Sequence, residues 1–256
     1  MTPGAGNPPR VSAVVGLTLR PLRARGTGSL PGYARSLRAA CKATPPPFGM
    51  AWYGDRYREL AIEPRWLATS LIDNAEKEGA GSRKLWRLAG GTTDPEIAEQ
   101  IRRHAVDESR HALVYVAMLE TAFPGAVRRG VRRTLSDLSP RYRIKDRLPR
   151  RQAVPRRRVL DELIQMNIGE IRTRINQLLL APVITEFCPR QGKRRLSRML
   201  ASLMEDETRH IEYTARLIER AIRGGDEAFV RRTMARRMAE FNRITRAEVG
   251  GAYASV

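Results

Sequence analysis

Apolar residues recur every three or four positions along most of the chain after residue 63, the spacing that places them on one face of an α-helix. Leu67, Leu71 and Leu85 follow this spacing in the first such segment, and Ile164 and Ile171 follow it in the third. No stretch of useful length alternates between apolar and polar residues, as a half-buried strand does. The pattern predicts an all-α fold with helices over about 64–90, 94–122, 157–181, 193–222 and 226–247.

Prolines, glycines and one capping residue set the expected helix boundaries. Pro64 stands where a first-turn proline belongs, and Asp94 before Pro95 is a natural N-cap for the second helix. We expect Pro182 to end the third helix, because proline removes a backbone hydrogen bond. The glycine pairs at 90–91 and 224–225 are expected to end the first and fourth helices.

Composition divides the chain into an arm and a helical domain. Residues 1–50 are rich in proline, glycine and arginine, so we expect a flexible basic arm, although 30–42 can form a short helix. Residues 51–256 form the expected helical bundle. Within it, 124–158 carries thirteen Lys and Arg residues against two acids, and we interpret it as a basic crossover between two pairs of helices.

A short string occurs twice: DESRH at 107–111 and DETRH at 206–210, in a chain with three histidines. Glu108 and His111 are three residues apart, as are Glu207 and His210, so each pair shares one face of its helix. A carboxylate beside an imidazole is half of a site for iron or manganese. Two such halves and one glutamate from each of two other helices make the dinuclear site of a ferritin-like four-helix bundle. The helix order predicts this bundle, with a long crossover and an additional C-terminal helix.

The other two glutamates are chosen by their position relative to the apolar face. On the first helix Glu78 lies in phase with Leu71 and Leu85, whereas Glu76 lies on the solvated side. On the third helix Glu170 lies at the edge of the apolar face, whereas Glu162 lies opposite Ile171. The phase favours Glu78 and Glu170 as ligands. The predicted metal ligands are Glu78, Glu108, His111, Glu170, Glu207 and His210.

Charged residues next to the predicted ligands can hold them in place, because a ligating imidazole usually donates its second N–H to a carboxylate. Asp107 and Asp206 can each reach the histidine of the facing helix, and Arg110 and Arg209 can neutralise them. The alternative is that these four residues are solvent-facing charges.

The third histidine shares the face of the first string. His104 lies four residues before Glu108 and seven before His111, so it is either an additional ligand or a polar residue at the edge of the bundle. Tyr115 and Tyr213 follow the two ligand histidines by about one turn, and we expect them to pack.

The segment EDETRHIEYTARLIERA at 205–221 resembles the second metal-binding helix of soluble acyl-carrier-protein desaturases. The ligand spacings resemble those of the p-aminobenzoate N-oxygenases, and both families belong to the ferritin-like di-iron superfamily. The resemblance covers about 70–220 in outline. It implies two iron ions held by the six residues above, O2 as co-substrate, and hydroxylation, desaturation or N-oxygenation of an organic substrate. The N-oxygenases carry an extra histidine ligand on the other metal-binding helix, so His104 would be a mirrored arrangement.

Composition leaves several functional alternatives open. Without a rubredoxin-like cysteine set or a dinucleotide fingerprint, we expect an external electron donor, and manganese can replace iron. The net charge of +20 is nearly all arginine, which reflects either GC-rich coding or an acidic partner such as a substrate-carrying protein. The other functions considered are a tRNA-modifying di-iron hydroxylase and a ferritin- or rubrerythrin-like iron or peroxide handler.

The expected setting of the protein is the cytoplasm. Cys41 and Cys188 are far apart and in no paired motif, which is typical of a reduced compartment. We expect no membrane span and no secretion signal, and a homodimer is compatible with the sequence.

Overall fold

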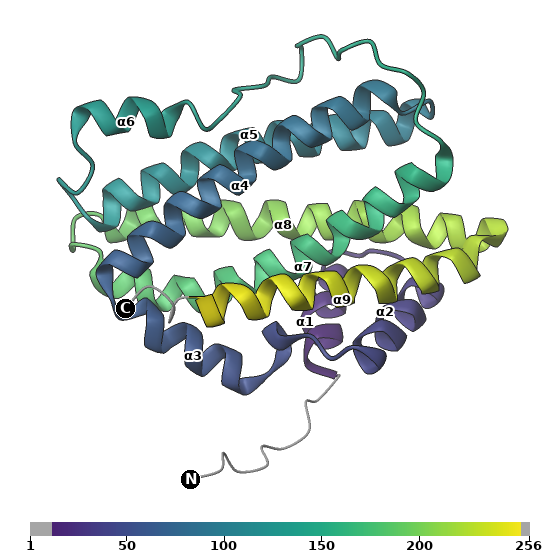
Figure 1. Ribbon diagram of the computed structural model, residues 1–256, viewed down its shortest axis with the longest axis horizontal. Coiled ribbons are helices and arrows are strands. Elements are labelled where there is room, and N and C mark those ends of the chain that lie inside the picture. The colour runs from purple at the N-terminus through teal and green to yellow at the C-terminus, as the bar shows by residue number, and fades with distance from the viewer. Residues whose placement is uncertain (1–11, 252–256) are drawn as a thin grey trace.

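The computed structural model describes residues 12–251, and the fold is built from helices (Figure 1). No strand occurs within this range, as the hydrophobic pattern predicts. The helices are α1 Ser12–Ala24, α2 Pro31–Ala43, α3 Ala51–Ala61, α4 Pro64–Gly91, α5 Pro95–Ala122, α6 Arg129–Ser136, α7 Arg156–Phe187, α8 Lys193–Ala221 and α9 Glu227–Gly251. A short 3₁₀ turn covers Pro47–Gly49, and a π turn covers Ile222–Asp226.

Four long helices form the body of the molecule. Helices α4 and α5 make one antiparallel pair, α7 and α8 make a second, and α5 packs against α8 (Figure 1). The predicted start of α5 is confirmed, because the Asp94 carboxylate accepts hydrogen bonds from the backbone N–H groups of Glu96 and Ile97. The predicted end of α4 is also confirmed, and Val154 of the crossover donates a hydrogen bond to the Gly91 carbonyl.

The interior of these four helices has a layered core. One apolar layer includes Leu71, Met118 and Leu203, and a second includes Leu85, Ile101 and Leu163. Leu71 and Leu203 of the first layer precede Glu78 and Glu207 on their helices, and Leu85 of the second layer follows Glu78. The carboxylates and histidines therefore lie between the two layers. Helix contacts are therefore made by apolar side chains above and below a polar centre.

The expectation of a flexible arm over 1–50 is wrong for the described part of that segment. Helices α1 and α2 pack against α7, α8 and α9, and Tyr33, Leu37 and Cys41 are fully buried there. These residues are spaced by four, so a narrow apolar stripe is present despite the high content of glycine, proline and arginine. Residues 1–11 lie outside the described part of the chain.

Two further expectations need correction. Helix α3 lies within a segment for which the pattern predicts no helix, and α7 continues through Pro182 to Phe187. Leu180 and Ile184 are buried on either side of this proline, so packing outweighs the one missing hydrogen bond. Leu178, placed on the apolar face by its spacing, is 43% exposed.

The basic crossover runs along the outside of the α4–α5 pair (Figure 1). It contains α6 and then an extended stretch that lies close to α4, where a side chain at Gly79 would clash with the Leu138 carbonyl. The single aromatic residue of the crossover, Tyr142, stacks on Trp86 of α4 with the ring centroids 4.4 Å apart. The crossover is thus anchored to the bundle at several points.

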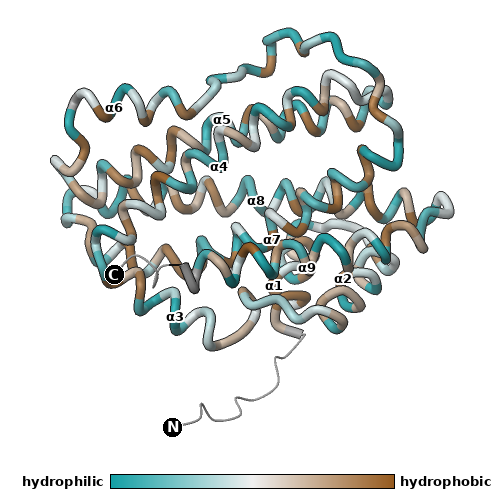
Figure 2. Tube along the Cα trace, in the orientation of Figure 1, coloured by the Kyte–Doolittle hydropathy of each residue, from teal (hydrophilic) through white to brown (hydrophobic). Residues whose placement is uncertain are grey.

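Apolar and polar residues are interspersed along the described helices, with no long apolar run (Figure 2). Among the helices of the described chain, none combines the length and the apolar character needed to cross a membrane. Helix α9, predicted as an additional C-terminal helix, packs on α2 and α7 after a turn in which Gly225 has a φ of 96°.

Candidate metal centre

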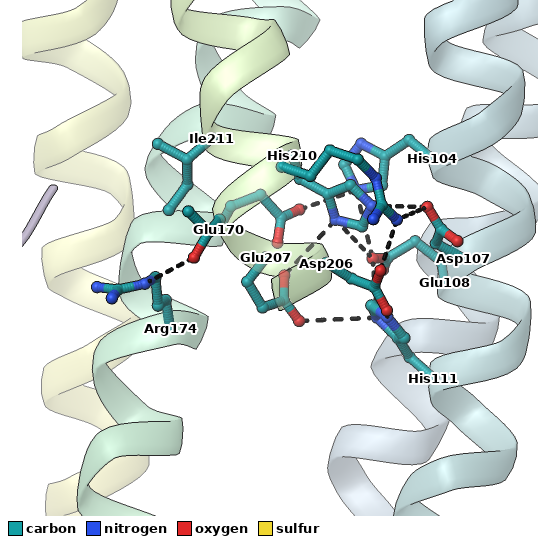
Figure 3. A network of polar contacts seen from close by, with 12 residues as sticks. His104, Asp107, Glu108, His111, Glu170, Arg174, Asp206, Glu207, His210 and Ile211 are labelled. Atoms are coloured by element: carbon teal, nitrogen blue, oxygen red, sulfur yellow. Dashed lines mark hydrogen bonds and ion pairs between the residues drawn. The ribbon is translucent and has the colours of Figure 1, made fainter. Parts of the chain in front are cut away.

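The two repeated strings lie on α5 and α8 and face one another in the middle of the bundle (Figure 3). Glu108, His111, Glu207 and His210 are all buried. Helix α4 contributes Glu78 and α7 contributes Glu170 to the same place. The structure therefore brings together all six residues that the sequence singles out as ligands.

These side chains form two adjoining groups, each compact enough to surround one ion. Each residue of a group offers one donor atom within 4.8 Å of the others. The first group is Glu78, His111 and Glu207. The second is His104, Glu108, Glu170 and His210.

Six side-chain atoms of this cluster have no hydrogen-bond partner within the described part of the chain. Such atoms are rare in folded proteins, because a buried polar atom without a partner costs about 1–3 kcal/mol. Here six of them point into one space: Glu78 Oε2, His104 Nε2, Glu108 Oε1, His111 Nδ1, Glu207 Oε2 and His210 Nδ1. Two cations, one in each group, would satisfy all six atoms, and carboxylate and imidazole ligands suit iron or manganese.

Both ligand histidines are oriented by aspartates from the facing helix. His111 donates through Nε2 to Asp206, and His210 donates through Nε2 to Asp107, each at 3.2 Å. Because a carboxylate only accepts, each Nε2 carries a proton, so Nδ1 of the neutral ring is the nitrogen that can bind a cation in the cluster. The sequence-based expectation for Asp107 and Asp206 agrees with this geometry.

The arginines of the two strings hold these aspartates in place. Arg110 forms an ion pair with Asp206, and Arg209 bridges Asp107 at 2.7 Å and Asp206 at 2.5 Å. The pKa of Asp206 is lowered despite burial, because His111 and Arg110 hydrogen-bond to the carboxylate and attract its charge. These residues are therefore not simply solvated charges.

His104 belongs to the cluster and not to the edge of the bundle. Its Nε2 lies 3.1 Å from Glu170 Oε1 and 3.3 Å from Glu108 Oε1, and its ring stacks on His210 with centroids 3.7 Å apart. Its Nδ1 lies 2.9 Å from the Tyr213 hydroxyl. Nε2 is thus the ring nitrogen available to an ion.

Carboxylates crowded in a buried site resist losing their protons together. Burial, followed by the charge of Glu170 and a hydrogen bond to it, raises the pKa of Glu207 to about 8. Burial and the neighbouring Glu108 likewise raise the pKa of Glu78. Bound cations would remove this cost, because they favour the charged carboxylates.

The two glutamates rejected on phase lie away from the cluster. Glu76 is exposed on the outer side of α4. Glu162 is buried but pairs with Lys84 at 2.6 Å and with Arg158 at 3.4 Å. Neither cysteine reaches the centre, since Cys41 and Cys188 belong to separate apolar clusters.

Gln177 is a contact that the sequence analysis does not identify. Its Nε2 donates to Glu207 at 3.1 Å and lies 3.4 Å from the Tyr115 hydroxyl. Gln177 follows Glu170 by seven residues, so the phase that selects Glu170 also points to it. Tyr115 is fully buried, as expected for packing, but Tyr213 contacts His104 directly.

Comparison of the chain with protein-family models, curated proteins and solved structures gives no match, so function must be inferred from the site itself.

Proposed function

We propose that the protein is an O2-dependent oxidoreductase with a dinuclear iron or manganese centre in a ferritin-like bundle. The observation that carries the proposal is a set of six inward-facing atoms of α4, α5 and α8 that have no hydrogen-bond partner in the described chain, with Glu170 of α7 beside them, between two apolar layers. Two bound iron ions would supply the electron-transfer chemistry by which O2 oxidises an organic substrate. Glu78, Glu108, Glu170, Glu207, His111 and His210 would hold them, with His104 as a seventh donor.

The residues of the chain prepare this centre in three ways. Asp107 and Asp206 fix the tautomer and the orientation of His210 and His111. The apolar layers on either side exclude water, which strengthens electrostatic interactions inside the site. His104 Nδ1 lies 2.9 Å from the Tyr213 hydroxyl, which can donate a hydrogen bond to this nitrogen or accept one from it.

An apolar pocket near the centre suits an organic substrate. It has a volume of about 190 Å³, and its lining residues include Ile97, Leu163 and Leu217. Ile97 lies seven residues from His104, Leu163 seven from Glu170, and Leu217 seven from His210. The pocket is therefore about two helical turns from the cluster. Arg156, the first residue of α7, also lines the pocket and pairs with Asp226 at 2.8 Å. A substrate delivered by an acidic carrier protein would meet basic side chains at this entrance.

A second candidate function, action on tRNA, is less well supported. The exposed Arg143, Lys145, Arg147, Arg150 and Arg151 can bind phosphates. Tyr142, the aromatic residue among them, is already stacked on Trp86, so it does not offer a free face to a base. We therefore favour a small-molecule or carrier-bound substrate and an external electron donor.

The test is an oxygen-uptake measurement on protein loaded with ferrous iron without air. We expect rapid O2 consumption on mixing, and binding that stops at two iron ions per chain when excess iron is supplied. Continued accumulation of iron would favour the iron-handling alternative. The matched control replaces His111 and His210 by alanine, and O2 uptake equal to that of the wild type in this variant would refute the proposal.

A further inference from the structure

The first part of the chain has a one-sided balance of charge. Residues 1–54 contain seven Lys and Arg residues and no Asp or Glu, so every acidic partner for them comes from outside this segment. Arg25 pairs with Glu212 of α8 at 2.9 Å, and Arg35 pairs with Glu227 of α9 at 3.4 Å. These two pairs help to hold α1 and α2 on the bundle.

The other four cations in the described part of this segment are exposed and have no acidic partner within the described chain: Arg20, Arg23, Arg38 and Lys42. All four line one hollow of about 750 Å³ between α1 and α2. The other residues that line it are Val15, Gly16 and Leu19, so no described acid contributes. The segments outside the described range, 1–11 and 252–256, contain no Asp or Glu that could pair with these cations.

An apolar stripe forms the floor of this hollow. Val15, Leu19 and Leu22 are spaced by four and three residues, so they lie on one face of α1. Leu22 lines a second hollow of about 430 Å³, which shares three lining residues with the first and is also free of acids among the described residues. The two hollows therefore form one groove along α1 and α2, which we call the α1–α2 groove.

The unpaired cations form a row along each edge of the α1–α2 groove. Arg20 and Arg23 are three residues apart on α1, and Arg38 and Lys42 are four residues apart on α2. Each pair thus shares one face of its helix. An apolar floor between two cationic rows complements a helix whose apolar face is flanked by carboxylates.

Other anionic partners fit the α1–α2 groove less well. No described aromatic side chain lines it, so the bases of a nucleic acid have no ring to stack on. A membrane surface is flat, whereas the floor is recessed, with Val15 and Leu19 only 6% and 9% exposed. A second copy of this chain carries the same net charge of +20 and would be repelled.

We propose that the α1–α2 groove is a docking site for an acidic amphipathic helix of a partner protein. The apolar face of that helix would lie on the floor, and its carboxylates would pair with the two cationic rows. The groove and α6 lie on opposite sides of the bundle (Figure 1), so this partner would leave the basic crossover free. The inference goes beyond the proposed function and does not depend on the metal centre.

The test measures binding to the full chain as purified, by fluorescence anisotropy of a labelled synthetic peptide. The probe is a helix with leucines on one face and glutamates on the other, and the comparison peptide has the same composition in scrambled order. We expect the helix to bind about tenfold more tightly or better, because only the helix presents an apolar face. Equal binding of the two peptides would overturn the proposal.

Two variants locate the binding. The double reversal Arg20→Glu/Arg38→Glu should weaken binding of the helix by about 30-fold or more, because two attractive contacts become repulsive. Gly16→Phe fills the groove without changing charge, since no heavy atom lies within 4 Å of a Cβ built on Gly16. It should weaken binding by about tenfold through steric exclusion. Wild-type affinity in either variant would overturn the assignment.

The matched controls lie at α6. The reversal Arg128→Glu/Arg133→Glu changes the net charge by the same amount at exposed positions, and Gly130→Phe adds the same side chain where a Cβ also has no neighbour within 4 Å. Both should leave the affinity for the helix unchanged. A control that weakens binding as much as its counterpart would show that the peptide responds to overall charge, and would overturn the groove.

Single-stranded RNA and phosphatidylglycerol vesicles are measured alongside the peptides. Tighter binding of either one than of the helix, lost in Arg20→Glu/Arg38→Glu, would overturn a protein as the occupant. Should Gly16→Phe fail to fold, Gly16→Leu takes its place with the same expected direction and the same contrary result. None of these measurements requires iron, so failure here leaves the proposed metal centre intact, and failure of iron binding leaves the groove intact.

Discussion

The α5 and α8 halves of the centre are built from nearly the same local sequence. Asp107, Glu108, Arg110 and His111 on α5 correspond to Asp206, Glu207, Arg209 and His210 on α8. Each aspartate holds the histidine of the other half at the same distance of 3.2 Å. The shared residues are thus those that orient the imidazoles and bring the carboxylates together.

The halves differ at the positions flanking these strings. His104 on α5 corresponds to Leu203 on α8, and Tyr213 on α8 corresponds to Val114 on α5. His104 and Tyr213 are hydrogen-bonded to one another, whereas Leu203 and Val114 belong to one apolar cluster. One group of donors therefore has four members with two imidazoles, and the other has three members with one. We therefore expect the two proposed metal positions to differ in affinity.

The largest expected effect comes from making the halves alike. Replacement His104→Leu copies Leu203 and removes one imidazole from the four-donor group. We expect the tighter of the two metal-binding steps to weaken by roughly 100-fold, about 2.7 kcal/mol, so that the two affinities converge. A metal titration by calorimetry measures this.

A control for this substitution is Val114→Leu, which enlarges an apolar side chain outside the donor groups and should leave both affinities unchanged. Two well-separated binding steps persisting in His104→Leu would show that His104 is not responsible for the difference.

A smaller effect is expected from the supporting aspartates. Asp206→Asn and Asp107→Asn remove the charge beside His111 and His210 but keep the shape of the side chain. Metal affinity should fall by about 10- to 100-fold in each, the usual effect of changing a carboxylate behind a ligand histidine. Each variant should weaken a different step, since the two histidines belong to different groups. Equal weakening of both steps by either variant would contradict the assignment.

The smallest effect is a change of stability with pH in the metal-free protein. Glu207 retains its proton up to a pKa of about 8 in the folded chain, against 4.5 in the unfolded chain, and the pKa of His111 is raised because Asp206, Glu108 and Glu78 outweigh its burial. The folded state therefore binds more protons than the unfolded state over this range, and stability falls as the pH rises from 4.5 to about 8.

Thermal unfolding across this range measures the effect, with a decrease in Tm as the expected result. Metal-loaded protein should not show the decrease, because ligands bind metal in their deprotonated forms. A metal-free protein whose Tm rises over the same range would contradict the raised pKa values.

The spacing of residues was sufficient to identify the long helices and the cluster, because both depend on local periodicity. Glu78 and Glu170 were separable from Glu76 and Glu162 by phase alone, and the structure places only the first two in the centre. The Asp–His pairs between α5 and α8 were predictable because a ligating histidine usually donates its second N–H to a carboxylate.

Features that depend on tertiary packing were not predictable from the spacing. The buried face of α2 is a narrow stripe of Tyr33, Leu37 and Cys41. The high content of glycine and arginine around this stripe led to the prediction of a flexible arm. Helix α7 passes through Pro182 because Leu180 and Ile184 are buried by other elements, which the local sequence does not show.

The most direct test of the central claim is a crystal structure of iron-loaded protein with anomalous scattering, together with metal analysis of the same sample. We predict two iron ions per chain between α4, α5, α7 and α8, with His111 Nδ1 and His210 Nδ1 each within about 2.5 Å of one of them. Less than half an equivalent of metal per chain, or ions bound away from these two histidines, would contradict the account.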